Sequence, residues 1–227
     1  MDDALGKVAG LAVAAAAGWW LLQKAAPRHG DRDGLTMRLT DFVANAYDKT
    51  AKQEKSCCVS ASAAARSAMG YTDEDRAIGA AVGADLGLGC GNPVRLAALV
   101  EGEEVLDLGC GAGFDIILAA LEVGKAGYAI GVDMLPSMLQ RARAAAEKAG
   151  VSGFTSFRLG EIDFLPAADA SVDVVVSNCV INLAEDKEQV CREMYRVLRP
   201  GGRIAISDVV AVSALPERLK HEEALAC

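Results

Sequence analysis

The sequence predicts an α/β protein with a parallel sheet in the strand order 3-2-1-4-5. From Val105 onward, short apolar runs alternate with amphipathic stretches, which is the pattern of buried parallel strands covered by helices on both faces. The glycine-rich segment Gly109–Gly113 follows the first of these apolar runs, as expected where the strand order of such a sheet reverses. Right-handed crossovers on either side of that point then give the order.

Three helical segments are expected before the sheet. The first runs from Leu39 to Lys55. Thr72 precedes three acidic residues, which is typical of a helix start, and this helix should end near Gly83. Pro93 suits the first turn of a third helix, which reaches Leu99. The segments between these helices, around residues 56–60 and 86–92, are predicted to be loops.

The second half of the chain alternates regularly. The predicted strands are Val105–Leu108, Tyr128–Val132, Thr155–Arg158, Val172–Ser177 and Arg203–Ser207. The predicted helices are Phe114–Val123, Pro136–Lys148 and Glu185–Leu198. Ligands of such sheets bind at the carboxyl ends of the strands. Four polar residues fall at those ends: Asp107, Asp133, Glu161 and Asn178.

Length and charge limit the organisation and the partners. A chain of 227 residues with 52% apolar residues fits one domain with extensions. We expect residues 1–36 to lie outside the fold, residues 37–100 to form a helical and loop cap, and residues 101–227 to form the core. A net charge of −8 argues against a nucleic-acid partner, because phosphate binding needs a basic surface.

The N-terminal segment and the cysteines indicate the compartment. The apolar run Val8–Leu22 has 15 residues, fewer than the roughly 20 of a membrane-spanning helix, and no basic segment precedes it as in a signal peptide. Trp19, Trp20 and Lys24 leave an N-terminal membrane anchor as an alternative. Seven cysteines, an odd number, indicate reactive or metal-binding thiols in a reducing compartment, so a cytoplasmic location is expected.

The glycine-rich segment predicts a nucleoside site. Glycine allows the backbone to approach a ligand closely, and Asp133, 20 residues past Gly113, can accept hydrogen bonds from ribose hydroxyls. Asp107 and Asp115 flank the segment with negative charge, which suits a cationic ligand better than a pyrophosphate. S-adenosylmethionine (AdoMet), with its sulfonium, is such a ligand.

This segment resembles the cofactor loop of the Rossmann-like AdoMet-dependent methyltransferases. The resemblance implies that Asp107, Gly109 and Gly111 hold the methionine end, Asp133 holds the ribose, and Met134 lies against the adenine. Glu161 and Ile162 would frame the other side of the adenine. The full set of expected cofactor residues is Asp107, Gly109, Cys110, Gly111, Gly113, Asp133, Met134, Glu161, Ile162 and Asn178.

A more specific resemblance involves the cysteines. Residues 37–227 resemble the arsenite methyltransferases, and the element Ser177–Leu183 is the most diagnostic match. The other matching segments are Ser56–Cys58, Leu86–Pro93, Asp107–Asp115, Gly131–Met134, Gly160–Ile162 and Arg199–Gly202. In that family, thiolates hold trivalent arsenic, and further cysteines cycle through a disulfide.

The resemblance implies a role for each of five cysteines. Cys179 and Cys227 match the arsenic-binding pair, and Cys90 matches the third ligand and disulfide partner. Cys57 or Cys58 matches the early disulfide partner of Cys90, and the choice between them stays open. Two further cysteines are not expected to bind arsenic. Cys110 should pack near the cofactor, and Cys191 falls on the apolar stripe of a helix.

The chain departs from the family at its C-terminal end. A full methyltransferase sheet ends with a sixth strand and a reversed seventh strand, and only 19 residues follow Asp208. We therefore expect those two strands to be missing and the fifth strand to form an edge of the sheet. The polypeptide is then either a fragment or a chain completed by a partner.

The predicted function is methyl transfer from AdoMet to thiolate-bound trivalent arsenic. The resemblance implies arsenite or methylated trivalent arsenicals as substrates and thioredoxin or glutathione as reductant, and a monomer is expected. One alternative is a generic small-molecule C- or O-methyltransferase, which would leave the cysteines unexplained. The other is a non-catalytic metalloid-binding fragment. Zinc is disfavoured, because adjacent Cys57 and Cys58 lack the spacing of a zinc chelate.

Overall fold

The computed structural model describes residues 39–52 and 69–210. Its centre is a five-stranded parallel sheet in the order β3-β2-β1-β4-β5, which confirms the predicted topology. The strands are β1 (Glu104–Leu108), β2 (Tyr128–Asp133), β3 (Thr155–Leu159), β4 (Val172–Asn178) and β5 (Leu198–Ser207). Within the described residues, β3 and β5 are the two edges of the sheet.

Helices connect and precede the strands. The α-helices are α2 (Leu39–Ala51), α4 (Asp73–Val82), α5 (Pro93–Ala97), α6 (Phe114–Val123), α7 (Pro136–Lys148) and α8 (Lys187–Val197). Two short 3-10 helices are η2 (Ser152–Phe154) and η3 (Ile181–Leu183). Helices α6 and α7 have the predicted bounds. Helix α8 begins two residues later than predicted, because the Asp186 side chain caps it by accepting a hydrogen bond from the Gln189 N–H.

The strand β5 begins earlier than predicted. It starts at Leu198, directly after α8, and includes Pro200, whereas the predicted strand begins at Arg203. Leu198 pairs with Val172, and the register between β4 and β5 shifts beyond that pair. Proline is compatible with an edge strand, because one side of such a strand forms no ladder hydrogen bonds.

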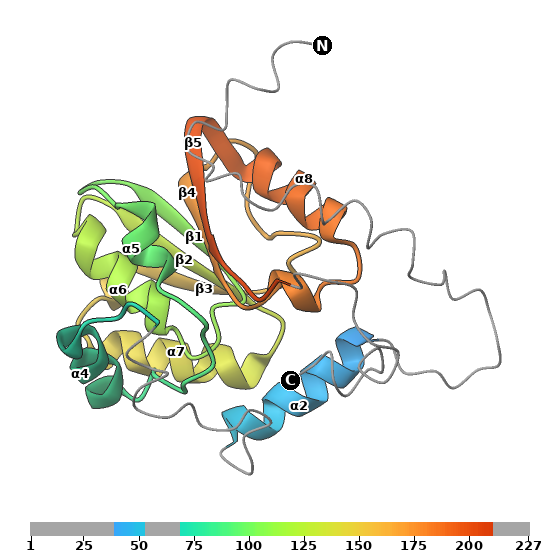
Figure 1. Ribbon diagram of the computed structural model, residues 1–227. Helices are drawn as coiled ribbons and strands as arrows, with labels where there is room; N and C mark the ends of the chain where they lie inside the picture. The colour runs from blue at the N-terminus through green and yellow to red at the C-terminus, as the bar shows by residue number, and fades with distance from the viewer. Residues whose placement is uncertain (1–38, 53–68, 211–227) are drawn as a thin grey trace, which may run out of the picture.

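Helices cover both faces of the sheet. Helices α5, α6 and α7 lie on one side and α8 on the other (Figure 1). Successive residues of β1 face opposite sides. Val105 packs with Ile116 and Val123 of α6, whereas Leu106 packs with Met194 of α8. The sheet is therefore fixed from both faces, and its carboxyl edge carries the loops.

The upstream helices pack beside that carboxyl edge. Helix α2 contacts α7 and η3, and Ala51 at its end packs against Leu135 and Met138. Leu86 and Leu88, which precede Cys90, pack against the same small cluster. Helix α4 starts with the predicted cap, a reciprocal pair of hydrogen bonds between Thr72 and Asp75. These contacts bring the Cys90 loop to the ends of β4 and β5.

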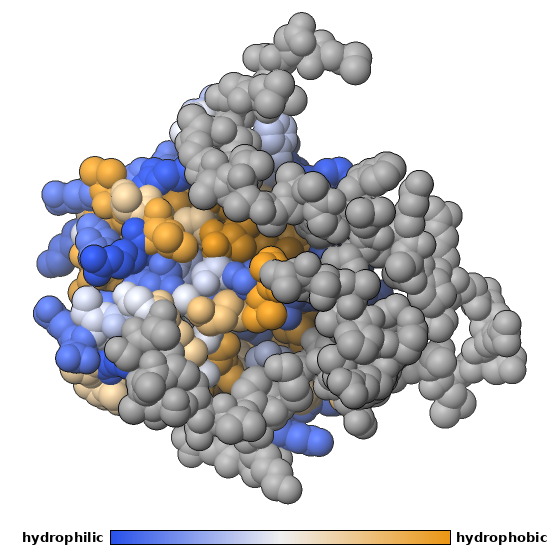
Figure 2. All heavy atoms as spheres, viewed as in Figure 1, coloured by the Kyte–Doolittle hydropathy of each residue, from blue (hydrophilic) through white to orange (hydrophobic). Residues whose placement is uncertain are grey.

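One face of the molecule carries many apolar residues. The face seen in Figure 2 carries hydrophobic residues across its middle and hydrophilic residues along its left edge. Much of a folded protein's surface is normally apolar. Across residues 39–52 and 69–210, no helix is long and apolar enough to cross a bilayer. The apolar run Val8–Leu22 lies outside the described residues.

Candidate active site

A cavity opens at the carboxyl ends of the strands. Its walls come from the glycine-rich loop after β1, the ends of β2 and β4, and the loop that carries Cys90. Ten residues named as candidates from the sequence line it: Asp107, Gly109, Cys110, Gly111, Asp133, Met134, Glu161, Ile162, Asn178 and Cys179. Most of the predicted cofactor residues therefore share one cavity with Cys179, whereas Cys90 is not among the residues that line it.

Gly113 is a cofactor candidate that does not line this cavity. A β-carbon at Gly113 would lie 3.0 Å from the Ala142 side chain, so the residue packs the loop against α7. Gly109 faces the segment between β4 and η3, where a β-carbon would lie 2.6 Å from the Val180 side chain. Both glycines, and Gly111 between them, have positive φ angles, which only glycine adopts without strain.

Asp133 closes the glycine-rich loop. One carboxylate oxygen accepts a hydrogen bond of 2.9 Å from the Gly111 N–H, and the other accepts one of 2.8 Å from the Leu135 N–H. Burial raises the pKa of Asp133, and the two backbone hydrogen bonds oppose that rise. Each carboxylate oxygen has a second lone pair, so the group keeps the capacity to accept from a ligand.

Asp107 is buried without a hydrogen-bond donor from the described residues. Its side chain is 2% exposed at the end of β1. Burial, and then the nearby carboxylates of Asp115 and Asp133, raise its pKa well above the ordinary value. A cation bound in the cavity would favour the ionised form of this carboxyl group.

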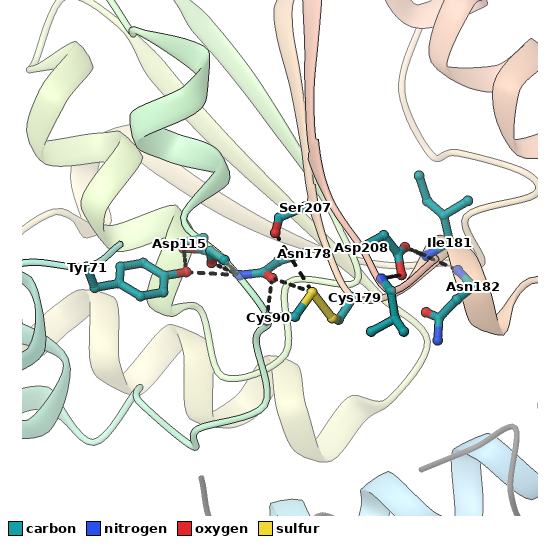
Figure 3. Close-up of a disulfide and its surroundings, with 11 residues drawn as sticks. Tyr71, Cys90, Asp115, Asn178, Cys179, Ile181, Asn182, Ser207 and Asp208 are labelled. Carbon is teal, nitrogen blue, oxygen red and sulfur yellow. Dashed lines mark hydrogen bonds between the residues drawn. A yellow bond between two sulfur atoms is a disulfide. The ribbon is translucent and has the colours of Figure 1, made fainter. Parts of the chain in front are cut away.

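A third buried acid, Asp115, forms a hydrogen-bonded cluster with Tyr71 and Asn178 (Figure 3). The Tyr71 hydroxyl donates to one Asp115 oxygen at 2.6 Å, and the Asn178 amide donates to the other at 2.9 Å. Burial raises the pKa of Asp115 to about 6, although both hydrogen bonds lower it. Burial, and then Asp115, raise the pKa of Tyr71. Tyr71 was not predicted as a site residue from the sequence; its ring centroid lies 4.9 Å from that of Phe114.

Cys90 and Cys179 form a disulfide, and Cys179 lines the cavity (Figure 3). Their Cα atoms lie 6.0 Å apart. The resemblance implied a bond from Cys90 to Cys57 or Cys58, and the structure instead pairs Cys90 with Cys179. The reason is that the Cys90 loop lies on the end of β4, which Cys179 follows directly. Cys57, Cys58 and Cys227 lie outside the described residues.

The end of β5 supports both cysteines. The Cys179 N–H donates to the Ser207 carbonyl at 2.8 Å, and the Ser207 hydroxyl lies 3.8 Å from the Cys90 sulfur. Asp208 accepts hydrogen bonds from the N–H groups of Ile181 and Asn182, at 3.0 and 3.2 Å, and so fixes the start of η3. Neither Ser207 nor Asp208 was predicted as a site residue from the sequence.

Two cysteines are free among the described residues. Cys110 is buried beside Gly131, where a β-carbon would lie 2.7 Å from its sulfur. Burial raises the pKa of the Cys110 thiol, which disfavours the reactive thiolate. Cys191 is half-buried against the core on the α8 side of the sheet, as its helical spacing predicts. Over the described part of the chain, no group of three or more histidine, cysteine or acidic side chains is arranged to hold a metal ion.

Comparison with known proteins shows which family the chain is similar to. A family profile described as "Methyltransferase domain" matches residues 99–227. The chain is 56% identical over 167 residues to an arsenite methyltransferase of Halobacterium salinarum, covering 73% of this chain and 42% of that protein. It is 46% identical over 144 residues to an arsenite methyltransferase of Aquipseudomonas alcaligenes, covering 60% and 41% respectively. The chain thus spans less than half the length of these two curated relatives.

A solved structure shows the same fold. The crystal structure of an arsenic(III) S-adenosylmethionine methyltransferase from Chlamydomonas reinhardtii matches with a TM-score of 0.56 and 37% identity, covering 72% of this chain and 56% of that one. The profile match spans more than half of the present chain and includes all five strands. The chain belongs to the methyltransferase domain family.

Proposed function

We propose that this chain transfers a methyl group from AdoMet to trivalent arsenic held by cysteine thiolates. The observation that carries the proposal is that Cys179, bonded to Cys90, lines the cavity that Asp107 and Asp133 also line. The similarity to proteins named arsenite methyltransferases supports the choice of arsenic.

The cofactor residues divide along the cavity. When bound, AdoMet supplies an electrophilic methyl group on a cationic sulfur. In our proposal Asp107, Gly109 and Gly111 hold its methionine end, and Asp133 accepts hydrogen bonds from the ribose. Met134, Glu161 and Ile162 frame the adenine. Two features support this division: the Asp107 carboxyl group has no described donor, and Asp133 keeps free lone pairs after bonding Gly111.

The arsenic site requires reduction of the disulfide. Arsenite exchanges its hydroxyl groups for thiolates and releases water, and we propose Cys90, Cys179 and Cys227 as the three ligands. In the disulfide form, Cys90 and Cys179 have no thiolate to offer. One dithiol or two molecules of glutathione must therefore reduce that bond, and their two sulfur atoms join as a disulfide in exchange. We propose thioredoxin or glutathione for this role.

The protein's contribution to the transfer is mainly positioning. Thiolate-bound arsenic carries a lone pair and no proton, so no general base is needed. Holding that lone pair in line with the methyl carbon accounts for the rate advantage. The transfer formally oxidises As(III) to As(V), and two thiolates return the electrons by joining as a disulfide. Cys90 paired with Cys57 or Cys58 remains one proposed product. The observed bond between Cys90 and Cys179 supports a second pairing.

The proposal also covers the cellular compartment, the oligomeric state and the substrates. We place the protein in the cytoplasm as a monomer, with residues 37–100 as the cap that carries Cys57, Cys58 and Cys90 over the core. Arsenite and methylated trivalent arsenicals are the proposed substrates. The reducing pool of that compartment regenerates the thiols after each turnover.

The direct test is arsenic speciation. The full chain is incubated with arsenite, AdoMet and a thiol reductant, and the products are separated and identified by their arsenic content. We expect methylated arsenic that increases with time and depends on the reductant. Arsenite recovered unchanged, from protein shown separately to bind AdoMet, would contradict the proposal.

A further inference from the structure

We propose that Asn178 is a positioning residue that holds the Cys90 backbone over Cys179, and that it is not a ligand of the cofactor. Asn178 ends β4 and directly precedes Cys179. The inference rests on the proposed function in one respect: that function makes Cys90 and Cys179 the reacting thiols. The contacts that support the inference are all within the protein and involve no bound ligand.

The amide nitrogen of Asn178 is saturated by the protein. Its nitrogen lies 2.9 Å from each of three acceptors, the Tyr71 hydroxyl, the Gly91 carbonyl and an Asp115 oxygen. An amide nitrogen has two hydrogens, so these three acceptors occupy both. The amide oxygen accepts a hydrogen bond of 3.0 Å from the Cys90 N–H. No N–H of this side chain is left for a ligand.

The orientation of the amide is determined by its neighbours. The Cys90 N–H can only donate, so it must meet the amide oxygen. The Gly91 carbonyl and the Asp115 carboxylate can only accept, so they must meet the nitrogen. A rotated amide would place donor against donor and acceptor against acceptor. The Asn178 side chain therefore links α6, through Asp115, to the loop that carries Cys90 (Figure 3).

The Cys90 loop fits this arrangement because glycines flank the cysteine. A β-carbon at Gly89 would lie 2.6 Å from the Asn178 amide nitrogen. A β-carbon at Gly91 would lie 2.0 Å from the Ser207 hydroxyl. Both distances are far shorter than van der Waals contact. The loop can thus lie directly on the ends of β4 and β5. On the β4 side, it contacts the Asn178 side chain.

Two neighbouring residues therefore act on Cys90. Cys179 bonds its sulfur, and Asn178 binds its backbone N–H. A hydrogen bond that keeps Cys90 beside Cys179 raises the effective concentration of one thiol for the other. Removing the amide releases the loop, lowers that concentration, and makes the disulfide easier to reduce. It leaves the Asp107 and Asp133 side of the cavity in place.

The test compares Asn178→Ala with Asn182→Ala in the full chain. Asn182 is an exposed asparagine four residues along, and its side chain is not part of the cluster. Each protein is equilibrated in glutathione buffers, and the Cys90–Cys179 bond is quantified by alkylation and peptide mass spectrometry. For Asn178→Ala we expect an equilibrium constant for disulfide formation about tenfold lower, a reduction potential about 30 mV less negative. Asn182→Ala should match the parent chain.

A second readout separates positioning from cofactor binding. Calorimetric titration with AdoMet should give Asn178→Ala an affinity within about twofold of the parent. A tenfold loss of AdoMet affinity, or an unchanged disulfide equilibrium, would overturn the proposal. If Asn178→Ala does not fold, Asn178→Ser is carried through both measurements under the same criteria. Neither measurement uses arsenic. Both therefore test this inference independently of whether the chain methylates arsenite.

Discussion

The carboxylate of Asp133 accepts a hydrogen bond of 2.9 Å from the backbone N–H of Gly111, 22 residues earlier in the chain. The contact ties the end of β2 to the glycine-rich loop after β1. It also places a buried acid at the wall of the cavity, beside the loop backbone. One side chain thus shapes the loop and lines the cavity, where we propose that it binds the ribose.

Replacing Asp133 should weaken cofactor binding. Asp133→Ala removes the proposed acceptor for the ribose hydroxyls and leaves the Gly111 N–H without its partner. Hydrogen bonds to charged groups contribute about 1.5–3 kcal/mol. We expect at least a tenfold loss of AdoMet affinity in titration calorimetry. Asp73→Ala, at an exposed position in the first turn of α4, is the control. Equal affinities in both variants would remove the ribose assignment.

Replacing Cys179 should abolish arsenic methylation without weakening the binding of AdoMet. Cys179→Ser removes one proposed arsenic ligand and one partner of the disulfide. Serine keeps the size of the side chain but is a poor ligand for a soft metalloid. We expect arsenic methylation to be lost and AdoMet affinity to stay within about twofold of the parent. Turnover retained by Cys179→Ser would refute the role of this thiol.

The buried Asp115 should make stability depend on pH. Its pKa is about 6 in the fold against 3.8 for an ordinary aspartate, so between these values the folded chain binds more protons than the unfolded chain. The free energy of unfolding therefore falls as pH rises from about 4 to 6, by about 3 kcal/mol from this group. In urea titrations, Asp115→Asn should lose much of this slope. An unchanged slope would show that other groups account for it.

The contact between Gly91 and Ser207 should be visible as an energetic coupling. Gly91→Ala places a methyl group 2.0 Å from the Ser207 hydroxyl, so the loop must move. Overpacking of this kind costs about 1–3 kcal/mol. Ser207→Gly removes the clashing atoms, and the double variant should recover part of that loss in denaturant unfolding. Strictly additive effects of the two substitutions would show that the residues do not meet.

The sheet and most helix bounds could be predicted because their signals are local. The alternation of apolar runs with amphipathic stretches predicts β1 to β4, and glycine and proline mark the ends of α6 and α7. The start of β5 was mispredicted, because Pro200 and the two glycines after it interrupt the apolar run, and the start depends on the pairing of Leu198 with Val172, which lies far away in the sequence.

The candidate site was predictable only where one segment carries the signal. The glycine-rich loop and Asp133 follow a spacing that the sequence displays. Tyr71 meets Asn178 across 107 residues, and no local pattern links them. The pairing of Cys90 with Cys179 belongs to the same class, because cysteine connectivity does not follow from the order of cysteines in a chain. Both contacts arise when strand ends and upstream loops converge at the edge of the sheet.

The central claim is that Cys90 and Cys179 bind arsenic as thiolates. The most direct measurement is arsenic X-ray absorption of the reduced full chain after addition of one equivalent of arsenite, beside Cys90→Ser and Cys179→Ser. We predict sulfur coordination of arsenic in the parent chain, with fewer sulfur neighbours or no retained arsenic in each variant. An arsenic atom coordinated by oxygen alone, or the same sulfur coordination in all three proteins, would contradict the claim.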